Sequence, residues 1–114
     1  MKEHEKNILN KIKAYAMQTL EFKENMDYNK FSSDAKTVAA CALNLSQIGE
    51  LAARLDDEFI DANCDVPWRK IRGMRNRIVH DYEGLQLNIV WDVLQEFLPE
   101  LIDSINGYGF SDKK

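Results

Sequence analysis

The sequence predicts an all-α fold, an up-down bundle of four to five helices that forms a single domain over residues 1–114. Apolar residues recur at intervals of three and four along most of the chain, which places them on one face of a helix. The chain contains only five Gly and two Pro, too few for the many turns of an all-β fold. At 114 residues it has room for one hydrophobic core and none for a second.

The first helix is expected over about residues 3–25, with Ile8, Ile12 and Phe22 on its apolar face. The segment 31–34 carries a capping signal, because Ser and Asp side chains accept hydrogen bonds from the unpaired N–H groups of a helix start. A second helix is therefore expected over about residues 34–59. Its small residues would let another helix approach closely, and they are Ala42, Ser46, Gly49 and Ala53.

Pro67 predicts the start of a third helix over about residues 67–82, because proline suits the first helical position, where its missing N–H is not needed. A fourth helix is expected from Asn88 to about residue 105, and Pro99 should kink or restart it. The tail from about residue 108 is expected to be frayed. Short connections between such helices are typical of a helical bundle.

Several function classes are disfavoured by composition. No apolar run approaches the roughly 20 residues that span a bilayer, so no membrane association is expected. The charged segment 1–7 does not resemble a signal peptide. Cys41 and Cys64 match no metal-binding spacing and are expected to be free thiols of a reducing cytoplasm. The chain has only two histidines, so neither a metal site nor a cofactor is expected.

The charge of the chain is unevenly distributed. The net charge is −4, yet residues 66–80 contain no acidic residue, so the rest of the chain carries −9. The five basic residues of this segment are Arg69, Lys70, Arg72, Arg75 and Arg77. This pattern indicates a local anion site rather than a broad nucleic-acid surface. Charge alone favours the plainer alternative, a solvated basic face of a helix.

On a continuous third helix, Arg75 projects on the apolar side, between Trp68 and Ile78. A buried guanidinium needs a carboxylate, a phosphate or a second subunit as its partner. An internal ion pair satisfies that need as well as a bound phosphate does. Asn76 lies one helical turn before His80 and could orient the imidazole, although a surface histidine near a helix end is also common.

Metal-free cleavage of RNA would suit this set of residues. The reaction needs a base for the 2′-hydroxyl, an acid for the leaving oxygen and a cation for the phosphorane oxygens. His80 suits the base or the acid role, and Arg75 suits the phosphate. A symmetric dimer would bring two copies of each residue to one groove.

The segment 75–82, RNRIVHDY, has Arg, four residues, His, one residue and Tyr. It resembles the signature of the HepT-like branch of the HEPN superfamily, the toxin half of HepT–MntA toxin–antitoxin pairs. The flanking sequences agree with this resemblance: IGE at 48–50, VPW at 66–68, RGM at 72–74 and IVW at 89–91.

The resemblance implies a HEPN-type bundle that forms a homodimer, and a metal-independent ribonuclease whose catalytic pair is Arg75 and His80 at the subunit interface. It assigns Asn76 a supporting role. It also implies an MntA-like nucleotidyltransferase antitoxin, which would transfer AMP to Tyr82. With RNA as the substrate, the basic segment suggests the phosphate contacts, which are Lys70, Arg72 and Arg77.

Two alternatives remain open at this point. The chain could be a non-catalytic accessory or substrate-binding subunit of a nucleotidyltransferase, with the same bundle and the same partner. Alternatively, the motif could be structural, with Arg75 ion-paired inside the bundle and Tyr82 buried.

Overall fold

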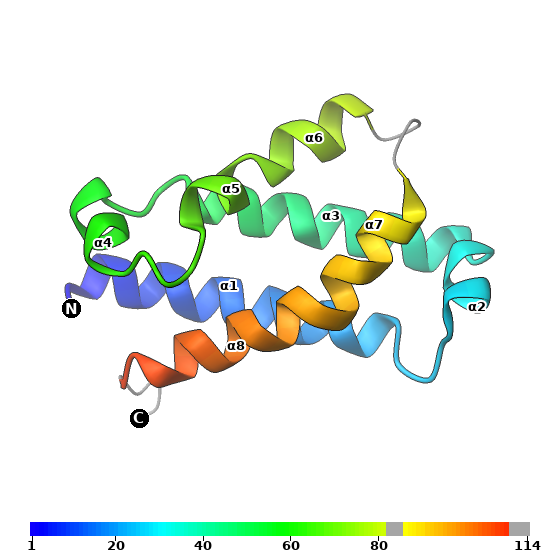
Figure 1. The fold of residues 1–114 in the computed structure, drawn as a ribbon, viewed down its shortest axis with the longest axis horizontal. Helices are drawn as coiled ribbons and strands as arrows, with labels where there is room; N and C mark the ends of the chain where they lie inside the picture. The colour runs from blue at the N-terminus through cyan, green and yellow to red at the C-terminus, as the bar shows by residue number, and fades with distance from the viewer. Residues whose placement is uncertain (82–85, 110–114) are drawn as a thin grey trace.

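The structure, a computed structural model, describes residues 1–81 and 86–109, and for residues 78–81 it describes the backbone alone. Every regular element in this part of the chain is a helix, which confirms the predicted all-α class. Two long helices, α1 (Glu3–Phe22) and α3 (Ala35–Ala52), run antiparallel and pack along each other (Figure 1). They form the frame on which the shorter helices are placed.

Two short helices connect the longer ones. α2 (Tyr28–Ser32) begins after Asp27, whose side chain accepts a hydrogen bond from the N–H of Lys30 at 2.8 Å. The capping signal at Asp34 is confirmed, because its carboxylate accepts from the N–H of Thr37 at 3.2 Å at the start of α3. α3 ends at Ala52, seven residues before the predicted end. The chain turns there and forms α4 (Asp57–Ala62).

The predicted third helix is divided in two, so the prediction of a continuous helix over residues 67–82 was wrong. α5 (Trp68–Arg72) follows Pro67, and α6 (Met74–Asp81) begins after Gly73. The N–H of Gly73 bonds to the carbonyl of Lys70, three residues back, at 3.1 Å. Such a bond tightens the last turn of a helix and ends it.

The kink or restart predicted at Pro99 corresponds to a π-helical turn just before the proline, and the backbone stays helical on both sides of it. The last part of the bundle consists of α7 (Leu87–Asp92), the π-helical turn η2 (Val93–Phe97) and α8 (Leu98–Gly107). Pro99 lies in the first turn of α8, where its missing N–H costs little. Just before it, the N–H of Leu98 reaches the carbonyl of Val93, five residues back.

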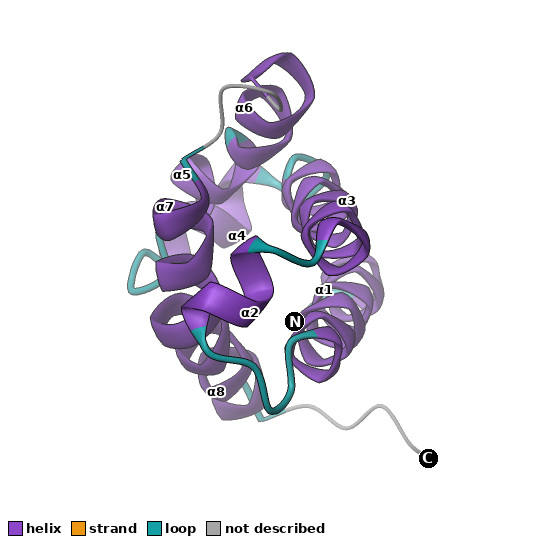
Figure 2. Ribbon diagram, turned by 90° about the vertical axis from the view of Figure 1, so that its right-hand side faces the viewer, coloured by secondary structure: helices purple, strands orange, loops and turns teal. Residues whose placement is uncertain are grey.

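The core lies between the α1–α3 pair and the later helices. α8 packs on α1, whereas α5 and α6 pack on α3 (Figure 2). The largest side chains of the core are essentially fully buried, and they include Leu9, Ile12, Phe31, Ile48, Trp68 and Leu94. No helix in the described residues is both long enough and apolar enough to cross a membrane.

Candidate functional site

Residues 75–81 of the RNRIVHDY segment lie on α6, and α6 packs directly against α3. A Cβ atom added to Gly49 would lie 2.9 Å from both the backbone N of Arg75 and the backbone O of Ile71. The two backbones therefore touch at Gly49, and only glycine leaves room for this approach. This confirms the predicted close approach at one of the small residues of the second helix. The contact fixes where Arg75 sits relative to Glu50, the next residue of α3.

Arg75 forms an ion pair with Glu50. Its Nε lies 2.7 Å from Oε1 of Glu50, and both side chains are about half exposed, at 48% and 45%. Its Nη1 also donates a hydrogen bond to Oδ1 of Asn76 at 3.4 Å. Arg75 thus meets a carboxylate, as one of the sequence hypotheses required. The expected burial of Arg75 was wrong. Its Cβ lies on the side of α6 that meets α3, 3.4 Å from a Cβ built on Gly49, but its guanidinium reaches Glu50 and the side chain is 48% exposed.

The other residues of the segment are described to different extents. Asn76 and Arg77 are exposed on α6. His80 lies in the last turns of α6, but its side chain is outside the described part of the structure. Tyr82 also lies outside the described residues. The structure therefore brings Arg75 and Asn76 together, while the predicted convergence of Arg75 with His80 stays a prediction.

Two of the basic residues on α5 contact α4. Arg72 donates from Nε to the carbonyl of Ala52 at 3.2 Å and from Nη2 to the carbonyl of Leu55 at 2.8 Å. Its Nη2 also lies 3.4 Å from Oδ1 of Asp57. Arg69 forms a more exposed pair with Asp61 at 3.1 Å. Arg72 thus fastens the end of α3 to the start of α4, and its role as an RNA phosphate contact stays a prediction.

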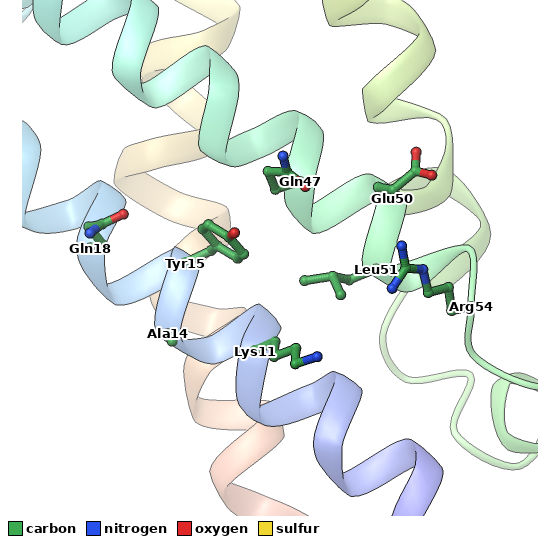
Figure 3. A pocket seen from close by; sticks show the side chains of 8 residues that line it. All are labelled: Lys11, Ala14, Tyr15, Gln18, Gln47, Glu50, Leu51 and Arg54. Atoms are coloured by element: carbon green, nitrogen blue, oxygen red, sulfur yellow. The ribbon is translucent and has the colours of Figure 1, made fainter.

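A cleft of about 490 Å³ lies between α1 and α3, beside the Arg75–Glu50 pair. Figure 3 shows Lys11 and Arg54 near one end of the cleft and Gln18 near the other. Glu50 lines the cleft and also pairs with Arg75. The cleft therefore lies next to the part of α6 that carries Arg75. The remaining lining residues are Ala14, Tyr15, Gln47 and Leu51.

A separate polar cluster joins the start of α1 to the α3–α4 connection. Nε2 of His4 lies 2.9 Å from the carbonyl of Arg54 and within 4 Å of carboxylate oxygens of Glu5 and Asp56. Glu5 is 2% exposed and accepts a hydrogen bond from the N–H of Asp56 at 3.2 Å. One imidazole and two carboxylates could hold a metal ion. In the structure, however, a backbone carbonyl and Lys2 already partner His4 and Asp56.

Residues 8–106 match the family described as ribonuclease HepT-like. The chain belongs to this family. It is 31% identical over 86 residues to "Putative RNase MJ0127" of Methanocaldococcus jannaschii, covering 75% of this chain and 71% of that protein. It is 30% identical over 102 residues to "Probable ribonuclease HepT" of Thermococcus cleftensis, covering 89% and 92%. No solved structure matches the chain.

The family predicted from the RNRIVHDY segment is thereby confirmed. In this HepT-like chain, the sequence placed Glu50 only within the IGE segment that supports the family resemblance, and it gave Glu50 no role in the site. Two signals could have pointed to it. Glu50 is the only acidic residue within α3, and it directly follows the glycine at which α6 approaches. Its partner could not be read from the sequence, because the pair joins residues 25 positions apart on separate helices.

Proposed function

We propose that this HepT-like chain is a metal-independent ribonuclease, the toxin of a toxin–antitoxin pair, acting as a homodimer. The observation that carries the proposal is the placement of Arg75 in a chain of the ribonuclease HepT-like family. Its guanidinium is half exposed on α6, in the same short segment as His80. A cation placed at the surface can meet an RNA phosphate without first breaking open the core.

In the proposed reaction, the 2′-oxygen of RNA attacks the adjacent phosphorus atom and the bond to the 5′-oxygen breaks. One copy of His80 takes the proton of the 2′-hydroxyl, and the partner's His80 gives a proton to the leaving 5′-oxygen. Arg75 stabilises the negative charge that develops on the non-bridging oxygens. The products are a 2′,3′-cyclic phosphate and a free 5′-hydroxyl.

The homodimer is proposed because one chain supplies a single histidine to this segment, whereas the reaction needs a base and an acid. Arg75, Asn76 and Arg77 are all exposed in the single chain, so a second copy could approach them. A C2 arrangement would place the same segment of both subunits on one axis. Lys70 and Arg77, both exposed, are the proposed contacts to the RNA backbone. Arg72 adds charge nearby, while the carbonyls of Ala52 and Leu55 hold its guanidinium.

The regulatory part of the proposal concerns Tyr82. A nucleotidyltransferase antitoxin would transfer AMP from ATP to the Tyr82 hydroxyl with release of pyrophosphate. The adduct adds negative charge and bulk two residues from His80, which would repel an RNA phosphate. Intact mass after incubation with the partner enzyme and ATP should rise in multiples of AMP. The Tyr82→Phe variant should show no gain, and an unchanged gain on that variant would refute this assignment.

The nuclease activity is tested with the purified protein, a single-stranded RNA and EDTA. We expect cleavage to continue in EDTA and to leave cyclic phosphate ends. His80→Ala should slow cleavage by about 100-fold or more, the usual contribution of a general acid or base. If His80→Ala cleaves as fast as the parent, the catalytic assignment is wrong. Nucleotide binding without any cleavage would instead favour the accessory-subunit hypothesis.

A further inference from the structure

We propose that Glu50 is the positioning residue of Arg75, holding its guanidinium in the orientation that an RNA phosphate requires. The inference rests on the proposed ribonuclease function and adds a residue that the sequence motif does not contain. The observation behind it is the 2.7 Å separation between Nε of Arg75 and Oε1 of Glu50. Glu50 lies on α3, outside the segment 75–82 that carries the motif.

The two partners of this pair have well-anchored backbones. Glu50 directly follows Gly49, at which the backbones of α3 and α6 touch. The residues of α3 that flank Gly49 and Glu50 are buried, with Ile48 at 0% and Leu51 at 6% exposure. Arg75 provides one of the backbone atoms of the same contact. The distance between the two side chains is therefore set by a rigid contact between helices.

An ion pair of this exposure contributes little to folding. Arg75 and Glu50 are 48% and 45% exposed, and pairs in such surroundings are weakened by solvent and by the cost of ordering two long side chains. The same ordering is useful for a guanidinium that must meet a phosphate, because the entropy of fixing it is lost before RNA arrives. Glu50 contacts Nε and Asn76 contacts Nη1, so neither of these contacts engages the N–H groups of Nη2.

Two physical effects make opposite predictions for a variant without the Glu50 charge. If Glu50 acted only through its charge, its removal would make the site more positive and would strengthen binding of RNA. If Glu50 positions Arg75, its removal would leave the guanidinium mobile and would weaken catalysis despite the more favourable charge. The sign of the change therefore distinguishes the two effects.

The test compares Glu50→Gln with Glu96→Gln. Glu96 is an exposed acid on η2, so its substitution makes the same change in net charge away from α6. We expect Glu50→Gln to lower kcat by about tenfold with at most a threefold rise in KM, as for the loss of orientation of a transition-state contact. Glu96→Gln should leave both constants unchanged, and Glu50→Asp should recover part of the loss. An increase in kcat/KM for Glu50→Gln would overturn the proposal.

A double-mutant cycle shows whether Glu50 acts through Arg75. In an Arg75→Ala background, Glu50→Gln should cause no further loss of rate, because the group that it positions is gone. A further tenfold loss in that background would show that Glu50 acts by another route and would contradict the proposal. The melting temperature of Glu50→Gln should stay close to that of the parent, which excludes unfolding as the cause.

The inference can also be tested if the chain cleaves no RNA, so that failure of the proposed function is recognised separately. A 2′-O-methyl oligoribonucleotide cannot be cleaved by 2′-oxygen attack and reports binding alone. Glu50→Gln should bind this oligonucleotide about threefold more weakly than the parent, whereas Glu96→Gln should not weaken it. Equal or tighter binding by Glu50→Gln, or no binding by the parent, would refute Glu50 as a positioning residue.

Discussion

Arg69 and Arg72 lie three residues apart on α5, and each pairs with an aspartate of α4. Their surroundings nevertheless differ. Arg69 is 60% exposed and contacts one carboxylate, whereas Arg72 is 26% exposed and also donates to the carbonyls of Ala52 and Leu55. Those carbonyls lie at and just beyond the end of α3, where helix geometry leaves carbonyl groups without helical partners. The two arginines should therefore contribute unequally to stability.

We expect Arg72→Ala to lower the free energy of unfolding by about 2 kcal/mol, because charge-assisted hydrogen bonds to two carbonyls are lost. Arg69→Ala should lower it by about 0.5 kcal/mol or less, as for an exposed ion pair. Urea unfolding followed by circular dichroism measures both values. Equal losses in the two variants would contradict the role assigned to Arg72.

These residues also show what the sequence could predict about the site. The basic segment, the RNRIVHDY pattern and the HepT-like family could all be found from the sequence, because they depend on neighbouring positions. The periodicity placed Arg75 on the packed side of the helix, in agreement with its contact with Gly49 of α3. It could not predict that the guanidinium is half exposed, because a long side chain can reach solvent from such a position. Its partner Glu50 depends on the packing of α3 against α6, which no local pattern specifies.

The contact of α3 with α6 at Gly49 positions Arg75 beside Glu50. We expect Gly49→Ala to destabilise the fold by about 1–3 kcal/mol, because the new methyl group meets backbone atoms that cannot rotate away. Gly107→Ala at the end of α8 is the matched control, since an added Cβ there meets no atom within 4 Å. It should be neutral or stabilise by up to about 1 kcal/mol. A neutral Gly49→Ala would mean that the two helices are not in close contact.

The helix boundaries were predicted correctly where one residue type marks them, and short helices without a periodic apolar pattern were missed. The capping residue Asp34 was correct, because it follows from the chemistry of one side chain. The helices α2 and α4 were not predicted, since they have only five and six residues and are too short for a periodic pattern. The end of α3 at Ala52 depends on contacts such as those of Arg72, which come from a distant part of the chain.

At the scale of the whole molecule, the amphipathic pattern was enough to predict a core made by helices, and the described residues form such a hydrophobic core. It combines residues from α1, α2, α3, α5 and α8, such as Leu9, Phe31, Ile48, Trp68 and Leu101. Each of these helices has an apolar face that the others cover, so none of them is expected to be stable alone. The two cysteines offer a measurement of this cooperativity, because one lies in the core and the other at the surface.

Cys41 is fully buried, and burial raises the pKa of its thiol to about 11, whereas Cys64 is exposed. At pH 8 we expect Cys64 to react quickly with a disulfide reagent and Cys41 to react only when the core opens, because the thiolate is the reactive form. The labelling rate of Cys41 in a Cys64→Ala variant should rise with urea as the global unfolding equilibrium does. Rapid labelling of Cys41 in native buffer would mean that α3 separates from the core without global unfolding.

The raised pKa of Cys41 also gives the sign of a pH effect on stability. The protonated thiol of Cys41 stabilises the native state below about pH 9, and this contribution is lost as the pH rises to about 11. The unfolding free energy of the parent should therefore fall more steeply across that interval than that of Cys41→Ala.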